Sequence, residues 1–243
     1  MVKVAAGDAS PYDALAPEYY DAVRHPTCAN FRYASKELIK SWFEKLADYR
    51  PICEVGAGRS VAAELLLEGG GSTSELYLTD SAQSMLDHSL GWKIPSGHIS
   101  VAEASRLPFE TSSFSLCISS LGDPYNTKEM WVELARVLRD YGYAIFTTPS
   151  YEWASAYRQL TGSGDSVAEF YLSDGRTVFA PSLIYDQACQ EKLIALDPSM
   201  EVVDFQVVTY SQLPSGSVSP KLLVAKEGNL PIAVGYLVRK SPR

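Results

Sequence analysis

The chain has few of the features that mark secreted, metal-binding or membrane proteins. It has only 4 cysteines in 243 residues, scattered without C-x-x-C spacing, so we expect no disulfide and no metal site. Cys53 and Cys117 lie within predicted buried strands, where cysteine acts as a small core residue. No apolar run approaches the roughly 18 residues of a membrane span, and no signal peptide is evident. We therefore expect a soluble, cytoplasmic protein with no membrane partner.

Positive charge is also scarce. The formal net charge is -8, the isoelectric point is near 5.0, and no run of Lys or Arg occurs. Nucleic-acid binding relies on clustered cations that neutralise phosphates, so the charge balance disfavours it and favours a small-molecule partner. The hydrophobic content of 46% is enough for a single-domain core. The sequence leaves monomer and homodimer open.

A glycine-rich turn follows one apolar run, and an acid ends the next. Residues 51–60 read PICEVGAGRS, and residues 76–80 read LYLTD. In open α/β sheets this arrangement binds a nucleoside cofactor, with a tight backbone turn at one strand end and a ribose acceptor at the next. The third glycine of a dinucleotide fingerprint is replaced by Val61, which weakens that interpretation. The pattern predicts an adenosine-containing ligand.

The segment from Glu54 to Ser60 resembles the first motif of class I S-adenosylmethionine (SAM) dependent methyltransferases, with Ser60 in place of the usual last glycine. The resemblance continues in order over roughly residues 12–150. The family's usual Pro-Gly-Gly turn is here Asp140-Tyr141-Gly142. The further matching segments are Asp80 with 81–86, 99–109, 114–120 and 133–148.

The resemblance implies an α/β, Rossmann-like, doubly wound sheet of seven strands with an antiparallel last strand. Residues 1–243 would form one methyltransferase domain. Within it we expect lid helices over 11–48, with helical patterns at Pro11–Arg24 and Phe31–Leu46, and a SAM-binding core over 49–148. A cap insertion, with a helical piece and a hairpin turning at Asp174-Gly175, would occupy 149–185, and a helix and strands 186–243.

The same resemblance implies SAM as cofactor and a set of residues that hold it. Asp80 would bind the ribose hydroxyls, although an N-cap role for the following helix is an alternative. Glu54 would lie near the cofactor's ammonium group or act as a helix-dipole partner. The expected cofactor residues are Tyr12, Tyr20, Glu54, Gly56, Ala57, Gly58, Asp80, Ser81, Met85, Glu103, Ala104 and Ser120.

Aromatic and polar residues at the expected mouth of the site indicate where an acceptor binds. Tyr12, Tyr19 and Tyr20 resemble the family's lid, where one phenol ring would contact the sulfonium, ordinary packing being the alternative. His25 is a candidate general base, or a structural, hydrogen-bonded histidine. Trp153 and Arg158 follow the fifth strand at its carboxyl end, where ligands of such sheets bind.

The loop after the fourth strand reads Leu121-Gly122-Asp123-Pro124-Tyr125-Asn126. It partly resembles the [D/N]-P-P-[Y/F] motif of amino-methyltransferases, but the second proline is missing, and an Asp-Pro turn needs no function. On this basis Asp123 and Asn126 join His25 as expected catalytic residues. Tyr125 joins Tyr19, Trp153 and Arg158 as expected substrate-binding residues.

The sequence thus predicts SAM-dependent methyl transfer to a nitrogen or oxygen of a small molecule. One alternative is an amino-methyltransferase acting on a nucleobase or RNA. Another is a non-catalytic nucleotide-binding Rossmann protein, or an NAD-dependent dehydrogenase of related fold. The acceptor atom and the identity of the substrate stay open.

Overall fold

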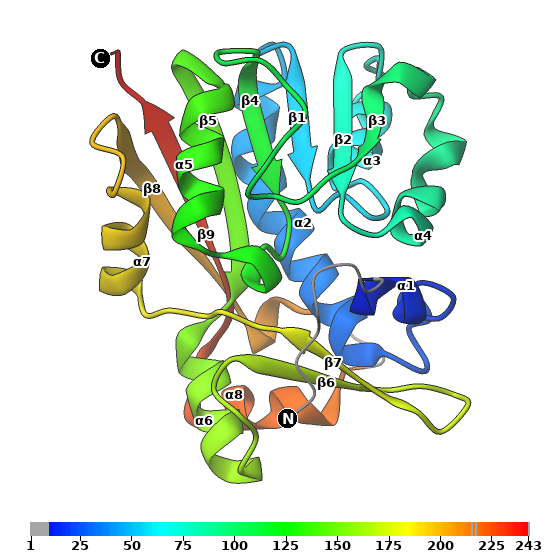
Figure 1. The fold of residues 1–243 in the computed structure, drawn as a ribbon. Helices are drawn as coiled ribbons and strands as arrows, with labels where there is room; N and C mark the ends of the chain where they lie inside the picture. Colours follow the sequence, from blue (N-terminus) through cyan, green and yellow to red (C-terminus); the bar gives the residue numbers. More distant parts are fainter. Residues whose placement is uncertain (1–9, 215, 217, 243) are drawn as a thin grey trace.

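A seven-stranded sheet forms the centre of the computed structural model, which describes residues 10–214, 216 and 218–242 (Figure 1). The domain predicted over 1–243 includes residues 1–9, which lie outside the described part. The strand order is β3-β2-β1-β4-β5-β9-β8, and β9 runs antiparallel to both neighbours, which confirms the predicted sheet. Its strands are β1 (Ile52–Val55), β2 (Leu76–Asp80), β3 (Ile99–Val101), β4 (Phe114–Ser119), β5 (Leu138–Pro149), β8 (Met200–Thr209) and β9 (Pro231–Lys240).

Helices cover both faces of the sheet, so the central strands are buried on both sides. All four residues of β1 are buried, and Cys53 of β1 pairs in register with Cys117 of β4. Both thiols lie in the core, as expected for small buried residues. One face carries α2 (Pro26–Leu46), α3 (Val61–Glu68) and α4 (Gln83–Leu86), and the other carries α5 (Lys128–Val137) and α7 (Gln187–Ile194).

The lid differs from its predicted boundaries. The helix α1 covers only Pro11–Leu15, turns follow to Arg24, and α2 begins at Pro26 instead of Phe31. Two prolines explain the difference. Pro17 has no N–H to continue α1, whereas Pro26 occupies the first helical position, where proline is favoured.

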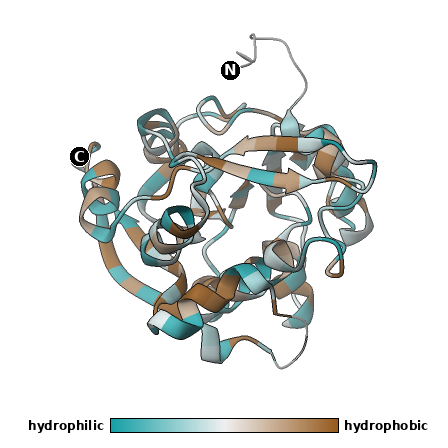
Figure 2. Ribbon diagram, turned by 90° about the horizontal axis from the view of Figure 1, so that it is seen from below, coloured by the Kyte–Doolittle hydropathy of each residue, from teal (hydrophilic) through white to brown (hydrophobic). Residues whose placement is uncertain are grey.

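The cap follows β5, at the carboxyl ends of the parallel strands. It holds α6 (Tyr151–Thr161) and a two-stranded hairpin of β6 (Val167–Tyr171) and β7 (Thr177–Pro181), an arrangement compatible with the expected helical piece and hairpin. Gly175 adopts a φ of +88° in the hairpin turn. Figure 1 shows the hairpin crossing this end of the molecule beside α1, and Figure 2 shows the same end from below. The helix α8 (Leu223–Gly228) lies against α6. The sequence did not predict α8.

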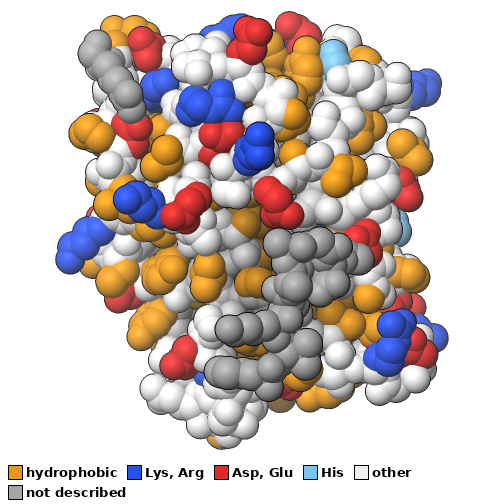
Figure 3. Space-filling model, in the orientation of Figure 1, with side chains coloured by type: hydrophobic (Ala, Val, Ile, Leu, Met, Phe, Trp, Pro, Cys, Tyr) orange, Lys and Arg blue, Asp and Glu red, His pale blue; other side chains and the backbone are white. Residues whose placement is uncertain are grey.

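The face in Figure 3 carries acidic and basic side chains interspersed, without a basic patch. Within the described part of the chain, no helix combines the length and apolar character needed to cross a membrane. The same part has no group of three or more His, Cys, Asp or Glu side chains placed to hold a metal ion.

Candidate functional site

Two cavities adjoin one another at the carboxyl ends of the strands. The glycine-turn cavity, of about 450 Å³, lies against Gly56, Ala57 and Asp80. The cap cavity, of about 690 Å³, lies against α6 and the hairpin. Their linings have four residues in common, which form a shared wall between the two spaces: Tyr12, Tyr19, Leu121 and Pro124.

The glycine turn makes room for side chains of the cavity wall. Gly56 has a φ of +63° and Gly58 a φ of +44°, a backbone region that L-residues rarely adopt. A Cβ atom on Gly56 would overlap the Tyr125 ring and hydroxyl. A Cβ atom on Gly58 would overlap the Tyr20 hydroxyl and lie 3.2 Å from the Met85 methyl carbon. Both glycines are therefore required by packing as well as by φ.

Asp80 connects the end of β2 to this turn. Its Oδ2 accepts a hydrogen bond from the Gly58 N–H at 3.0 Å, and its Oδ1 accepts one from the Ala82 N–H at 2.9 Å. Burial raises the pKa of the Asp80 carboxyl, and these two hydrogen bonds oppose that rise. Each carboxylate oxygen retains acceptor capacity, and the side chain lines the glycine-turn cavity. Asp80 thus holds the turn and can still accept hydrogen bonds from ligand hydroxyls.

Glu54 lies beneath the turn and lines neither cavity. Its carboxylate accepts hydrogen bonds from the Ser60 hydroxyl, from the Val61 N–H at 3.0 Å and from the Ala62 N–H at 3.1 Å. Burial raises its pKa, and these hydrogen bonds act against the rise. The geometry is that of a partner for the N-terminus of α3, the alternative role considered from the sequence.

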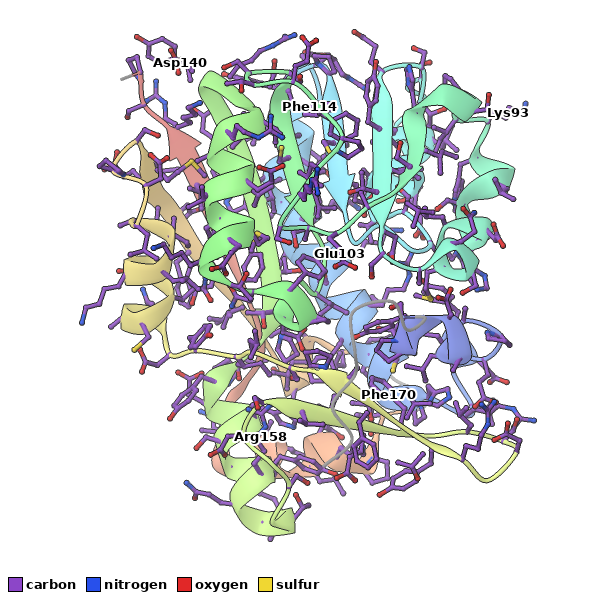
Figure 4. All side chains as sticks on the ribbon, in the orientation of Figure 1. Lys93, Glu103, Phe114, Asp140, Arg158 and Phe170 are labelled. Atoms are coloured by element: carbon purple, nitrogen blue, oxygen red, sulfur yellow. The ribbon has the colours of Figure 1, made fainter. Side chains whose placement is uncertain are left out.

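Ten of the twelve expected cofactor residues line the glycine-turn cavity, Glu54 and Gly58 being the exceptions. Figure 4 labels Glu103, which lies beyond β3 near the carboxyl ends of the strands. Side chains from the lid, from two strand ends and from the loop after β3 therefore converge on one space. The ten are Tyr12, Tyr20, Gly56, Ala57, Asp80, Ser81, Met85, Glu103, Ala104 and Ser120.

Arg32 also lines this cavity, although no sequence motif marks it. Its guanidinium lies 5.5 Å from the Tyr20 ring centroid and donates hydrogen bonds to the Arg59 carbonyl at 2.7 Å and to Glu64 at 2.8 Å. Within the described part of the chain, it is the only Lys or Arg in the cavity lining. An anionic ligand group in this cavity would therefore share the Arg32 guanidinium with Glu64.

The lid tyrosines form one aromatic cluster. The Tyr12 and Tyr19 ring centroids are 6.0 Å apart, and those of Tyr19 and Tyr20 are 5.0 Å apart, both pairs being edge to face. The Arg59 N–H donates a hydrogen bond to the Tyr20 hydroxyl at 2.7 Å. Burial raises the pKa of Tyr20 to about 12, so this phenol is neutral at physiological pH. The rings pack together, and all three also line the glycine-turn cavity.

Asp123 is the buried carboxyl of the cap cavity. The Ser182 hydroxyl donates a hydrogen bond to its Oδ2 at 3.0 Å. Arg158 donates hydrogen bonds to the Ser182 hydroxyl at 3.2 Å and to its carbonyl at 3.0 Å. Burial raises the pKa of Asp123 to about 7, against the lowering effect of the Ser182 hydrogen bond. Asp123 can therefore exchange a proton near neutral pH.

His25 lies in the cap cavity lining and is tied to the hairpin. Its Nε2 is 3.4 Å from Glu18 Oε1, and Glu18 also accepts a hydrogen bond from the Ser173 N–H at 3.0 Å. His25 occupies the N-cap position of α2, but its side chain makes no capping hydrogen bond. The contacts therefore connect the lid to the hairpin turn through Glu18.

Asn126 does not lie where an acceptor could reach it. Its side chain is fully buried outside the linings of both cavities. It donates hydrogen bonds to the Leu183 carbonyl at 3.1 Å and to Gln190 at 2.6 Å, and accepts one from the Trp131 indole at 3.0 Å. The expectation that Asn126 is catalytic does not fit this placement, because these bonds satisfy its amide and fix the loop after β4.

The four expected substrate-binding residues divide between the cavities. Tyr19 lines both, and Trp153 and Arg158 line the cap cavity. Tyr125 lines only the glycine-turn cavity and donates a hydrogen bond from its hydroxyl to the Val55 carbonyl at 2.7 Å. Tyr125 therefore supports the glycine turn and contributes to that cavity's wall.

Residues 53–146 match a family model described as a methyltransferase domain. This span begins in β1 and ends in β5, so it contains the glycine turn and Asp80. Residues 53–146 form a methyltransferase domain. The match supports an enzyme that uses SAM as its cofactor.

Solved structures show the same fold. PH0226 from Pyrococcus horikoshii has a TM-score of 0.62 at 13% identity, over 96% of this chain and 100% of that one. A SAM-dependent methyltransferase from Clostridium acetobutylicum has a TM-score of 0.60 at 15% identity, over 95% and 99%. A complex of the Haloferax volcanii Trm112 activator with a methyltransferase has a TM-score of 0.62 at 12% identity, over 95% and 99%. No curated protein matches this chain.

Proposed function

We propose that the methyltransferase binds SAM in the glycine-turn cavity and methylates a nitrogen or oxygen of a small molecule bound in the cap cavity. The shared wall is the observation that carries this proposal. Because Tyr12, Tyr19, Leu121 and Pro124 line both cavities, a methyl donor in one and an acceptor in the other meet there.

The residues of the glycine-turn cavity fit the three polar parts of SAM. Asp80 has acceptor capacity for the ribose hydroxyls, and Arg32 provides a cation for the methionine carboxylate. The lid tyrosines offer ring faces to the sulfonium, an attraction of about 0.5 to 2 kcal/mol. When bound, SAM supplies an activated methyl group.

The chain itself positions the acceptor and takes its proton. Orientation of reacting groups can lower a barrier by about 7 to 11 kcal/mol in well-aligned systems. Asp123 immediately precedes Pro124 of the shared wall and has a pKa of about 7. Its carboxylate form accepts the proton that an acceptor hydroxyl or amine loses when its oxygen or nitrogen takes the methyl group.

The cap favours a small acceptor over a nucleic acid. The hairpin and α6 line the cap cavity, whereas RNA recognition needs an accessible, positively charged surface. The formal net charge of -8 supports the same choice. The burial of Asn126 also weakens the partial resemblance to amino-methyltransferases of nucleobases.

The test uses SAM with an isotope-labelled methyl group and measures transfer of the label to molecules of a cell extract, which is then fractionated. We expect label in the low-molecular-weight fraction and none in RNA. Gly58→Val is the negative control, since it removes the room that the glycine turn needs. Label in RNA, or equal labelling with Gly58→Val, would contradict the proposal.

A further inference from the structure

An aromatic row runs along one wall of the cap cavity and ends at a lysine. The Phe31 and Trp153 ring centroids are 4.7 Å apart, and Trp153 and Tyr157 are stacked at 5.5 Å with an interplanar angle of 13°. The Lys221 ammonium lies 5.7 Å from the Tyr157 ring centroid. All four side chains belong to residues that line the cavity.

The backbone of Lys221 is anchored to the cavity wall. The Trp153 indole donates a hydrogen bond to the Lys221 carbonyl at 2.9 Å, and the Lys221 N–H donates one to the Ser219 hydroxyl at 3.2 Å. The Ser219 hydroxyl is 2.6 Å from the Thr27 hydroxyl of α2. The position of the lysine is therefore fixed by α2 and α6 together.

The Lys221 ammonium has no carboxylate within 4.0 Å among the described residues, and the residue is half-buried. Two further cations line the cavity. Arg24 is already paired with Glu18 and Asp21. Arg158 donates hydrogen bonds to Ser182, whose hydroxyl in turn donates one to Asp123. Lys221 lowers the pKa of the Cys28 thiol, which burial raises to about 12, so the ammonium acts on the cavity interior. An anionic ligand group would complete this arrangement.

Building on the proposed function, we propose that the acceptor is an aromatic carboxylate whose carboxylate group pairs with Lys221. Seven aromatic residues line the cap cavity, and the cavity volume of about 690 Å³ lies within the usual range of small-molecule sites. Figure 4 shows two of the lining residues, Arg158 on α6 and Phe170 on β6. The aromatic residues are Tyr12, Tyr19, Phe31, Trp153, Tyr157, Phe170 and Tyr171.

The charges also orient this acceptor. Asp123 adjoins Pro124 of the shared wall, and its carboxylate form repels an anion. Lys221 lines the cap cavity but not the glycine-turn cavity, and its ammonium attracts an anion. The carboxylate therefore lies at Lys221, and the methyl-accepting hydroxyl or amine lies at the shared wall beside Asp123.

The test is calorimetric binding of matched bicyclic probes to the protein loaded with S-adenosylhomocysteine. The probes are 6-hydroxy-2-naphthoate, its neutral methyl ester and the corresponding phosphonate. We expect the naphthoate to bind at least about tenfold more tightly than the ester, as for a charge-assisted hydrogen bond in a partly buried site. Lys221→Met, which keeps the apolar stem over Tyr157, should abolish this preference, and Lys221→Arg should retain it.

Lys226→Met is the matched control, because the Lys226 ammonium also lies over a tyrosine ring, at 5.6 Å from Tyr210, but outside the cap cavity. It should leave the preference unchanged. Equal binding of naphthoate and ester, absence of probe binding, tighter phosphonate binding, or a preference that survives in Lys221→Met would each overturn the inference. S-adenosylhomocysteine binding is measured first, so its failure would instead count against the proposed cofactor site.

Discussion

The Asp80 carboxylate accepts a hydrogen bond from the backbone N–H of Gly58, at 3.0 Å. This contact joins the acid at the end of β2 to the turn after β1, two motifs that are separated by 22 positions in the chain. A substitution of either residue therefore alters both the shape of the glycine turn and the hydrogen-bond acceptors that face the cavity.

Asp80→Ala should weaken S-adenosylhomocysteine binding by about 1.5 to 3 kcal/mol, since hydrogen bonds to a charged group are lost. Calorimetric titration measures the change. Asp48→Ala, at an exposed position near the end of α2, is the control and should bind as wild type. Unchanged affinity in Asp80→Ala would remove Asp80 from the cofactor site.

Gly58→Val should abolish cofactor binding. The new side chain would overlap the Tyr20 hydroxyl, and the φ of +44° disfavours a β-branched residue. Gly97→Val is the control. It makes the same chemical change at a position where a Cβ atom meets nothing within 4 Å. Circular dichroism first shows that both variants fold, and calorimetry then measures their cofactor binding. Equal binding by Gly58→Val and Gly97→Val would contradict this view.

Arg32→Met should discriminate between two ligands that share the adenosine part. S-adenosylhomocysteine has an amino-acid carboxylate, whereas 5′-methylthioadenosine lacks it. We expect the affinity for the first to fall about tenfold or more and that for the second to stay within about twofold. Arg32→Lys should recover part of the loss. Equal weakening of both ligands would show that Arg32 only supports the wall, through Arg59 and Glu64.

Asp123 should make stability depend on pH. Burial raises its pKa from 3.8 to about 7, so the folded state holds a proton that the unfolded state releases between these values. The free energy of unfolding should therefore fall as pH rises from about 4 to 7, by at most roughly 4 kcal/mol, and then level off. Asp123→Asn should remove this component, as urea titrations at pH 5 and pH 8 would show.

The rate of methyl transfer should also depend on the protonation of Asp123, but it should rise over the pH range in which the free energy of unfolding falls. The carboxylate form accepts the proton, so turnover should rise with pH around a midpoint of about 7. Asp123→Asn should lower turnover and flatten this profile while leaving S-adenosylhomocysteine affinity unchanged. A wild-type profile without a step near pH 7 would argue against Asp123 as the base.

Local patterns in the sequence were sufficient for the central strands, the glycine turn and the hairpin, because each depends on neighbouring residues. The order of the seven strands joins distant segments, and it was predicted from the family resemblance. Local patterns could not determine where side chains of the loops point. Glu54 and Asn126 both belong to recognisable motifs, yet Glu54 binds the start of α3 and Asn126 binds Gln190. The directions of these two side chains depend on packing against helices that follow later in the sequence, α3 and α7.

Residues brought in from distant elements were missed for the same reason. Arg32 reaches the glycine-turn cavity only because α2 packs beside the turn, and Lys221 reaches the cap cavity because Trp153 holds its carbonyl. The early end of α1 was readable in principle from Pro17, since proline cannot donate the next helical hydrogen bond.

The central claim is that the two cavities form one reaction site across their shared wall. A crystal structure of the protein with S-adenosylhomocysteine tests it most directly. The account predicts the adenosine part at Asp80 and the thioether sulfur in contact, within about 4.5 Å, with Tyr12, Tyr19, Leu121 or Pro124. A sulfur atom that faces away from this wall, or a ligand bound outside the glycine-turn cavity, would contradict it.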